Sequence, residues 1–210
     1  MKRRYSMVAA ALVATCVLLA RPAQATSILI NGDFETGDLT GWTKIPSCDC
    51  VFSAFGITTL RPHDGTYAVA FGGLNTGNGR EDTISQTVQT DAGQRYTLSF
   101  WLKQDSPPCT IIPDPLYCLA NDLAIRWNDV RVLYLISLPP GDYIEYSVDV
   151  VADAAVSNLA IMASNSPAYS RLDNIRLTAV PEPATVGLLA LGLLLVAPRH
   201  RRSRPDRGRY

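Results

Sequence analysis

The stretch from residue 26 to 179 consists of short runs in which apolar and polar residues alternate, and none of them has the 3.6-residue period of a helix. Gly, Asn, Asp and Pro separate the runs. The expected strands are at 27–30, 50–55, 66–71, 83–88, 95–103, 122–127, 130–136, 143–151, 158–163 and 171–178. About ten strands at this spacing predict an all-β fold, an antiparallel β-sandwich of the jelly-roll type. The runs at 122–127 and 130–136 flank Asn128-Asp129 and predict a hairpin.

The first 25 residues have the three parts of a secretory signal peptide. Residues 2–4 are basic, residues 7–20 are apolar, and Ala23-Gln24-Ala25 is a small-residue cleavage motif. We expect an N-terminal signal helix, export through the Sec machinery, and cleavage after Ala25 by signal peptidase.

Two other export routes have weaker support in the sequence. Arg3-Arg4 could belong to a twin-arginine signal, but Ser6 stands where such a signal has an apolar or aromatic residue. Cys16 could be a lipoprotein cysteine, but it lies inside the apolar region.

Residues 180–210 combine three parts in order: Pro181-Glu182-Pro183, an apolar run at 184–197, and a cluster of arginines from 199 to 209. The run has 14 residues, fewer than the ~20 that usually span a bilayer. Arginines that follow an apolar run stay on the cytoplasmic side and stop its transfer. No polar face with a helical period interrupts the run, as it would in a helix packed on a soluble core. We therefore predict a C-terminal transmembrane helix.

This tail resembles the PEP-CTERM sorting signal of exported proteins in Gram-negative bacteria, which databases also label as an ice-binding-protein C-terminal motif. The matching residues are Pro181 to Thr185, Gly187, the Leu-rich run and the arginines. The resemblance implies transient anchoring in the inner membrane, cleavage near the triplet by an exosortase-type transpeptidase, and delivery to the cell surface or extracellular matrix. The resemblance concerns where the protein is delivered and says nothing of its ligand.

The three segments differ in charge, although the whole chain is neutral. Residues 26–179 contain nine basic and 17 acidic residues, a net charge of −8. These 154 residues are enough for one domain with a sizeable core. Such an acidic body argues against nucleic acid and anionic membrane as ligands.

Four cysteines remain in an exported body once Cys16 is removed, and an even number predicts disulfides with three possible pairings. Cys109 and Cys118 bracket a Pro-rich loop, so a bridge between them is the first choice. Cys48 and Cys50 are too close to bridge each other comfortably and could pair across to that loop. A zinc site formed by the four thiols is the alternative.

The body resembles extracellular β-sandwich modules of the carbohydrate-binding, galactose-binding-like type. The likeness is carried by several short motifs in the expected order: 31–35 (Asn-Gly-Asp-Phe-Glu), Gly41-Trp42, 65–69, 84–88, 96–101 and 172–177. Each motif is weak alone, and together they indicate the fold and leave the ligand open.

The same resemblance implies a structural calcium ion held by Glu35 and Asp173, with backbone carbonyls and, as additional candidates, Asp33 and Asp38. Calcium takes six to eight oxygen ligands, which suits this residue type. The alternative is that the acidic residues near position 35 are turn residues and that Asp173 is a solvated strand end.

Sugar binding needs aromatic side chains on an exposed sheet face. Alternation places Trp101 opposite the apolar residues of its strand, and it predicts that Arg126, Tyr143 and Glu145 also point outward. We expect these four residues to line one ligand face, unless a loop such as 109–118 covers Trp101. Trp42 and Trp127 are assigned to the core.

No catalytic constellation is evident. His63 is followed by Asp64 in what reads as a turn, and the motifs of metalloproteases and serine hydrolases are missing from the sequence. The sequence therefore predicts a non-catalytic module for polysaccharide. The alternatives are a structural biofilm or exopolysaccharide-matrix component without a defined ligand and, less favoured, a glycan hydrolase.

Overall fold

The computed structural model describes residues 26–47, 55–72, 81–105, 121–165 and 168–181. The chain divides into two compact units, residues 1–180 and 181–210. Among the described residues no helix is long and apolar enough to cross a membrane. The predicted signal helix and the run at 184–197 both lie outside those residues.

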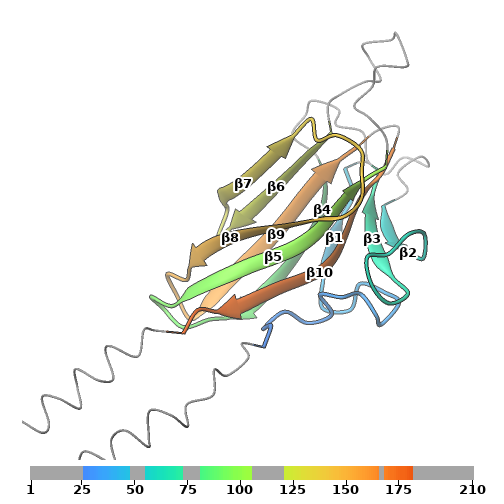
Figure 1. Ribbon diagram of the computed structural model, residues 1–210. Coiled ribbons are helices and arrows are strands. Elements are labelled where there is room, and N and C mark those ends of the chain that lie inside the picture. The colour runs from blue at the N-terminus through green and yellow to red at the C-terminus, as the bar shows by residue number, and fades with distance from the viewer. Residues whose placement is uncertain (1–25, 48–54, 73–80, 106–120, 166–167, 182–210) are drawn as a thin grey trace, which may run out of the picture. The chain divides into compact units, whose positions relative to one another are not determined.

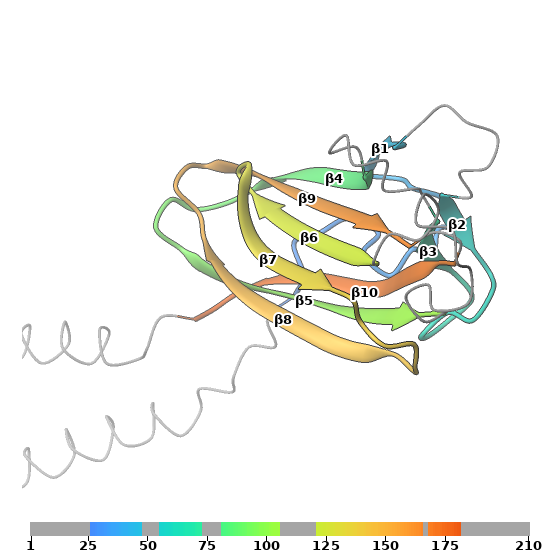
Figure 2. The same ribbon diagram turned by 90° about the horizontal axis from the view of Figure 1, so that it is seen from above.

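Within these described ranges, ten strands form two five-stranded antiparallel sheets (Figures 1 and 2). Sheet A has the order β1-β4-β9-β6-β7, and sheet B has the order β2-β3-β10-β5-β8. The strands are β1 (Thr43–Ile45), β2 (Gly56–Thr58), β3 (Ala68–Phe71), β4 (Asp82–Gln89), β5 (Arg95–Gln104), β6 (Asp122–Trp127), β7 (Val130–Ile136), β8 (Ile144–Val151), β9 (Val156–Ser164) and β10 (Ser170–Ala179). The predicted antiparallel β-sandwich is confirmed.

The core fills the space between the sheets because alternate side chains of each long strand point inward. In β5 the buried residues include Leu98 and Phe100, and in β9 they include Leu159 and Ile161. Trp42 and Trp127 are buried, as expected. The indole N–H of Trp127 donates to the carbonyl oxygen of Val151 at 2.9 Å, which satisfies its polar atom inside the core.

Three sequence-based strand assignments differ from the structure. The sequence predicts a strand at 50–55, of which residues 50–54 lie outside the described residues, whereas the observed strand β2 is Gly56–Thr58. Residues 27–30 form no strand. The amide of Ile28 donates to the Leu177 carbonyl oxygen of β10, but the amide of Ile30 donates to the side chain of Gln86, so no continuous ladder forms. The short edge strand β1 was not predicted, since three exposed residues carry no recognisable alternation. The predicted β6–β7 hairpin is confirmed, and Asn128 and Asp129 have φ values of 49° and 64°, as a tight hairpin turn requires.

Candidate functional site

Three of the predicted ligand-face residues lie on or beside sheet B. Trp101 on β5 pairs with Glu145 on β8 and with Asp173 on β10, so these side chains form one row on the outer face of the sheet. Tyr143 lies just before β8. The structure therefore brings Trp101, Tyr143 and Glu145 together.

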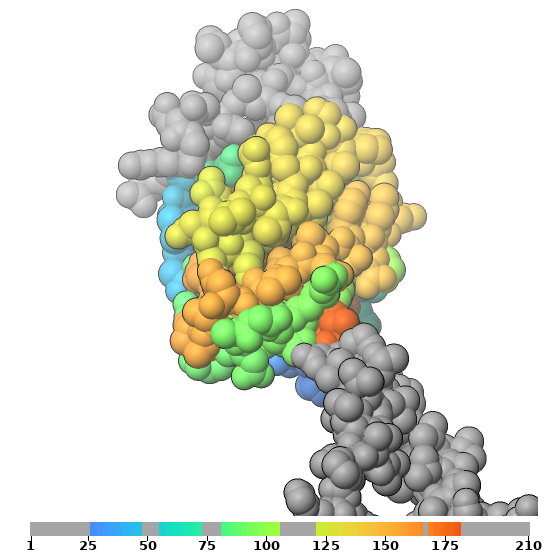
Figure 3. All heavy atoms as spheres, turned by 90° about the vertical axis from the view of Figure 1, so that its left-hand side faces the viewer, coloured from blue at the N-terminus to red at the C-terminus, as the bar shows by residue number. Residues whose placement is uncertain are grey.

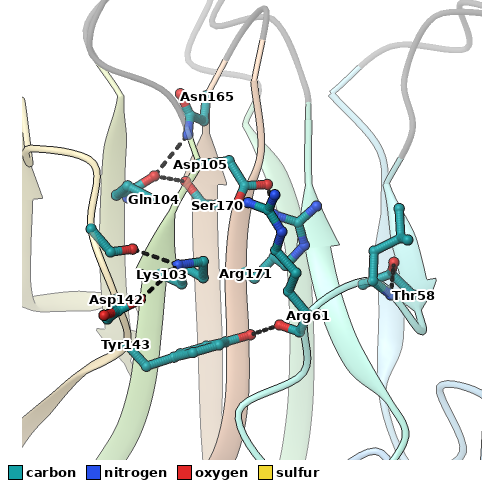
Figure 4. Close-up of polar contacts among 12 residues, drawn as sticks. Thr58, Arg61, Lys103, Gln104, Asp105, Asp142, Tyr143, Asn165, Ser170 and Arg171 are labelled. Carbon is teal, nitrogen blue, oxygen red and sulfur yellow. Dashed lines mark hydrogen bonds and ion pairs between the residues drawn. The ribbon is translucent and has the colours of Figure 1, made fainter.

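The loop between β2 and β3 covers Trp101. The imidazole of His63 stacks on the indole with ring centroids 3.9 Å apart, and the edge of the same imidazole meets Tyr143. The Tyr143 hydroxyl donates to the Arg61 carbonyl oxygen at 2.8 Å (Figure 4), and burial raises the pKa of that phenol. One indole face is thus occupied by the protein itself, which leaves it unavailable for stacking on a sugar.

The side chains of Glu35 and Asp173 hold this loop through hydrogen bonds to its backbone amides. Glu35 Oε1 accepts the amides of Thr66 and Tyr67, each at 2.9 Å. Asp173 Oδ2 accepts the amides of His63 and Asp64 at 2.8 and 3.2 Å. Both carboxylates therefore hold backbone amides of the β2–β3 loop in place. The sequence analysis did not predict this role.

Both residues also line one small cavity of about 240 Å³ with Asp33, Asp64 and Arg176. Calcium needs six to eight oxygen ligands. In the part of the chain that the structure describes, no three His, Cys, Asp or Glu side chains are grouped to hold a metal ion. The predicted site also includes backbone carbonyl oxygens, which are not among these side chains, so the calcium assignment stays a prediction.

Arg126 does not share this face. It lies on β6, which belongs to sheet A, so the expectation that all four residues line one face is wrong for Arg126. Alternation gives the direction of a side chain from its strand, but it cannot tell which of the two sheets contains that strand.

The outer face of sheet A carries a continuous row that combines apolar, small and aromatic side chains. The row crosses all five strands and consists of Ile45, Thr83, Met162, Ala124 and Tyr134. Four interstrand spacings of about 4.8 Å make this row about 19 Å long. A parallel row contains Thr43, Ser85, Ala160, Arg126 and Arg131.

A cavity of about 550 Å³ lies on this face, which we call the sheet A cleft. Its lining residues are Ile45, Pro46, Glu81, Thr83, Arg126, Asp129, Ala160 and Met162. Ala160 and Thr83 contribute short side chains to this lining, Ile45 and Met162 contribute apolar ones, and Glu81 and Arg126 contribute charged groups. Burial raises the pKa of Glu81, and the neighbouring Asp122 carboxylate adds to this rise.

Tyr134 extends the same face beyond the cleft. It is 43% exposed, and the guanidinium of Arg131 lies 4.8 Å from its ring centroid. β7 is an edge strand, and Figure 3 shows the yellow β6–β7 hairpin at the surface. A register shift between Ile125 and Arg126 changes which face the later residues of β7 use, so Tyr134 pairs with Ala124 and points outward.

Several predicted residues lie outside the described part of the chain. They are the four cysteines Cys48, Cys50, Cys109 and Cys118, and Glu182 and Pro183 of the sorting motif. Pro181 is described and follows β10 directly after Val180.

Residues 26–129 match the family described as a carbohydrate binding domain, and residues 179–202 match the PEP-CTERM protein-sorting motif. A search of curated proteins found no match.

Similar solved structures show the fold. TmCBM61 in complex with β-1,4-galactotriose is 16% identical, with a TM-score of 0.55 over 74% of this chain and 100% of that chain. A Stig cyclase from Fischerella sp. is 17% identical, with a TM-score of 0.52 over 76% and 100%. The K3 adhesin domain of Lys-gingipain from Porphyromonas gingivalis is 15% identical, with a TM-score of 0.50 over 71% and 96%.

At these identities the likeness concerns the fold alone, which here serves binding modules and a cyclase alike. The tail indicates export, exosortase processing and sorting to the cell surface. The chain thus combines a match to the PEP-CTERM protein-sorting motif in its tail with a match to a carbohydrate binding domain in its body, and the body has a β-sandwich fold similar to that of TmCBM61.

Proposed function

We propose that the body is a non-catalytic module that binds a polysaccharide chain across the outer face of sheet A. The observation that carries the proposal is the sheet A cleft, whose lining combines short and apolar side chains with the charged residues Glu81, Arg126 and Asp129. The exposed ring of Tyr134 continues the same face. Aromatic faces stack on sugar rings, and charged side chains bond the hydroxyl groups around them.

The length of the face supports a polymer as ligand. The cleft is open and crosses several strands, and a row about 19 Å long suits an extended chain better than a single sugar. Because His63 already stacks on the indole of Trp101, the outer face of sheet B is less suited to stack on a sugar ring. TmCBM61 was solved with β-1,4-galactotriose, so β-1,4-galactan is a reasonable first probe. Xylan is a second, because the similar CBM22-1–GH10 modules of Clostridium thermocellum xylanase 10B were solved with xylohexaose.

Replacement of Tyr134 or Arg126 by alanine is expected to weaken polysaccharide binding about tenfold. Loss of an aromatic contact or a charged hydrogen bond costs about 1.5 kcal/mol, which corresponds to a factor of ten in Kd. Affinity gel electrophoresis of the full chain in gels containing β-1,4-galactan or xylan, together with a glycan array, measures this effect.

Matched variants separate binding from general damage. Tyr134→Phe keeps the ring and is expected to bind within about threefold of wild type. Arg95→Ala removes an exposed arginine from sheet B and is expected to change nothing. Failure of every glycan to bind would favour a structural matrix component without a ligand, and full binding by Tyr134→Ala would move the site away from sheet A.

We also propose that the Sec machinery and signal peptidase process the N-terminus after Ala25, and that residues 184–197 anchor the protein in the inner membrane until exosortase cleaves the tail. Ser27 and Ile28 already contact Leu177 of β10, so the folded body begins immediately after the proposed cut. N-terminal sequencing of the exported protein is expected to begin at Thr26. A first residue beyond Ile28 would contradict this site.

A further inference from the structure

A second cavity, of about 330 Å³, lies on the outer face of sheet B and is separate from the sheet A cleft. Its lining residues are Phe55, Gly56, Ile57, Thr58, Leu60, Ala70, Tyr169 and Arg171. Arg171 pairs with Ala70, and Ala70 pairs with Gly56, so two short residues on neighbouring strands leave space beside the arginine. We call this space the Arg171 cavity. Its volume is within the range of sites that take one small ligand group.

Among the described residues that line this cavity, Arg171 is the charged one, and it is only 5% exposed. Its Nη1 forms an ion pair with Asp105, but in the part of the chain that the structure describes neither its Nε nor its Nη1 has a hydrogen-bond partner, and neither does Oδ1 of Asp105. A buried guanidinium N–H without a partner is costly, and a native protein normally supplies an acceptor for it. An acceptor that enters the cavity with a ligand would satisfy this group.

The local charge favours an anion. Asp105 is shared between Arg171 and the exposed Arg61, whose Nη1 lies 3.7 Å from Asp105 Oδ1 (Figure 4). One carboxylate thus faces two guanidinium groups, which leaves an excess of one positive charge. Burial lowers the pKa of Arg171, and the nearby charge of Arg61 lowers it further, as expected for a cation that lacks full compensation.

The walls of the cavity indicate what carries the anionic group. Phe55 and Tyr169 are aromatic, Leu60 is aliphatic, and Thr58 adds a hydroxyl group. An amphipathic sugar ring fits such walls. A single excess positive charge matches a singly charged carboxylate better than a doubly charged phosphate, and guanidinium–carboxylate hydrogen bonds are among the strong ones.

We propose that the Arg171 cavity binds the carboxylate of an acidic sugar residue, so that the domain recognises a uronate-containing polysaccharide. The proposal takes its ligand class from the proposed function, but it concerns a different sheet and different residues. The net charge of −8 on the body would repel polyanions in general. Retention of an acidic glycan therefore requires a specific site.

The test compares polygalacturonate with its methyl-esterified form, which has the same backbone without the free carboxylates. The full chain is expected to bind polygalacturonate at least about tenfold more tightly than the ester, with affinity that falls as salt rises. Leu60→Asp places a negative charge at the rim on a side chain that is 66% exposed, so folding is preserved, and it is expected to weaken binding about tenfold. Ile144→Asp, at a site that is 54% exposed on the edge strand β8, is the matched control and is expected to bind normally.

Each outcome decides a different point. Equal binding of the acid and the ester, or unchanged binding by Leu60→Asp, would overturn the Arg171 proposal. Loss of polygalacturonate binding in Tyr134→Ala but not in Leu60→Asp would also overturn it, while leaving the sheet A proposal intact. Acid-specific binding that is lost in Leu60→Asp, in a protein that ignores neutral glycans, would support the Arg171 cavity and contradict the sheet A proposal.

Discussion

Replacement of Gly32 by alanine is expected to destabilise the domain by about 3 kcal/mol or more. A Cβ atom at this position would lie 2.1 Å from the carbonyl oxygen of Ile175, far inside van der Waals contact. The backbone of Ile175 cannot shift easily to relieve this clash, because the residue is buried in β10 and its amide donates to the Gly32 carbonyl oxygen at 2.7 Å. Alanine would therefore separate the N-terminal segment from the strand that closes the domain.

Chemical denaturation followed by tryptophan fluorescence measures this effect. Gly141→Ala is the matched control, because no atom lies within 4 Å of a Cβ built at Gly141. Its expected change is within about 0.5 kcal/mol of wild type. A loss as small as this in Gly32→Ala would show that the contact with Ile175 does not hold the segment.

The motif around Gly32 shows why the fold could be predicted from sequence. The side-chain nitrogen of Asn31 donates to the carbonyl oxygens of Asp38 and Thr40, which shapes the turn, and Phe34 is fully buried against Trp42. Each residue of the motif has a packing or hydrogen-bonding role of its own. The motif therefore indicates the sandwich and leaves the ligand undetermined.

The candidate site was harder to predict because it depends on contacts between residues far apart in the chain. In a regular two-residue hairpin Tyr134 would pair with Leu123 and face the core. The register shift in β6–β7 turns Tyr134 outward, where it pairs with Ala124. The stacking of His63 on Trp101 likewise joins a loop to a strand, so local alternation could place Trp101 outward but could not show that it is covered.

Asp173 is the residue whose loss is expected to release the β2–β3 loop, at a cost of about 3 kcal/mol. It is 1% exposed, and its carboxylate accepts the amides of His63, Asp64 and Asn174. Asp173→Ala leaves three amides without their acceptor. The cost is not larger because the carboxylate is itself expensive to bury, which raises its pKa against the opposing effect of those hydrogen bonds.

The raised pKa sets the direction of the pH dependence. Because the folded state holds the Asp173 proton more tightly than the unfolded state does, protonation favours folding, and this contribution is lost as pH rises from below the ordinary value of 3.8 through the raised pKa. The wild type is therefore expected to lose this part of its free energy of unfolding over that interval. Asp173→Asn, which does not titrate, is expected to lack the loss.

Denaturation of wild type, Asp173→Ala and the control Asp149→Ala separates this role from a general effect of charge. Asp149 lies on the outer face of the same sheet, its side chain is half exposed, and it is expected to contribute less than about 1 kcal/mol. In Asp173→Ala the freed loop carries His63 away from Trp101, so the fluorescence of the folded state is expected to change as well.

The same three proteins also test whether Asp173 binds calcium. A carboxylate that holds amides gives a stability that EDTA does not alter, whereas a calcium ligand gives a Tm that rises on addition of calcium in wild type and not in Asp173→Ala. The first result would assign Asp173 to the loop, and the second would assign it to the cation.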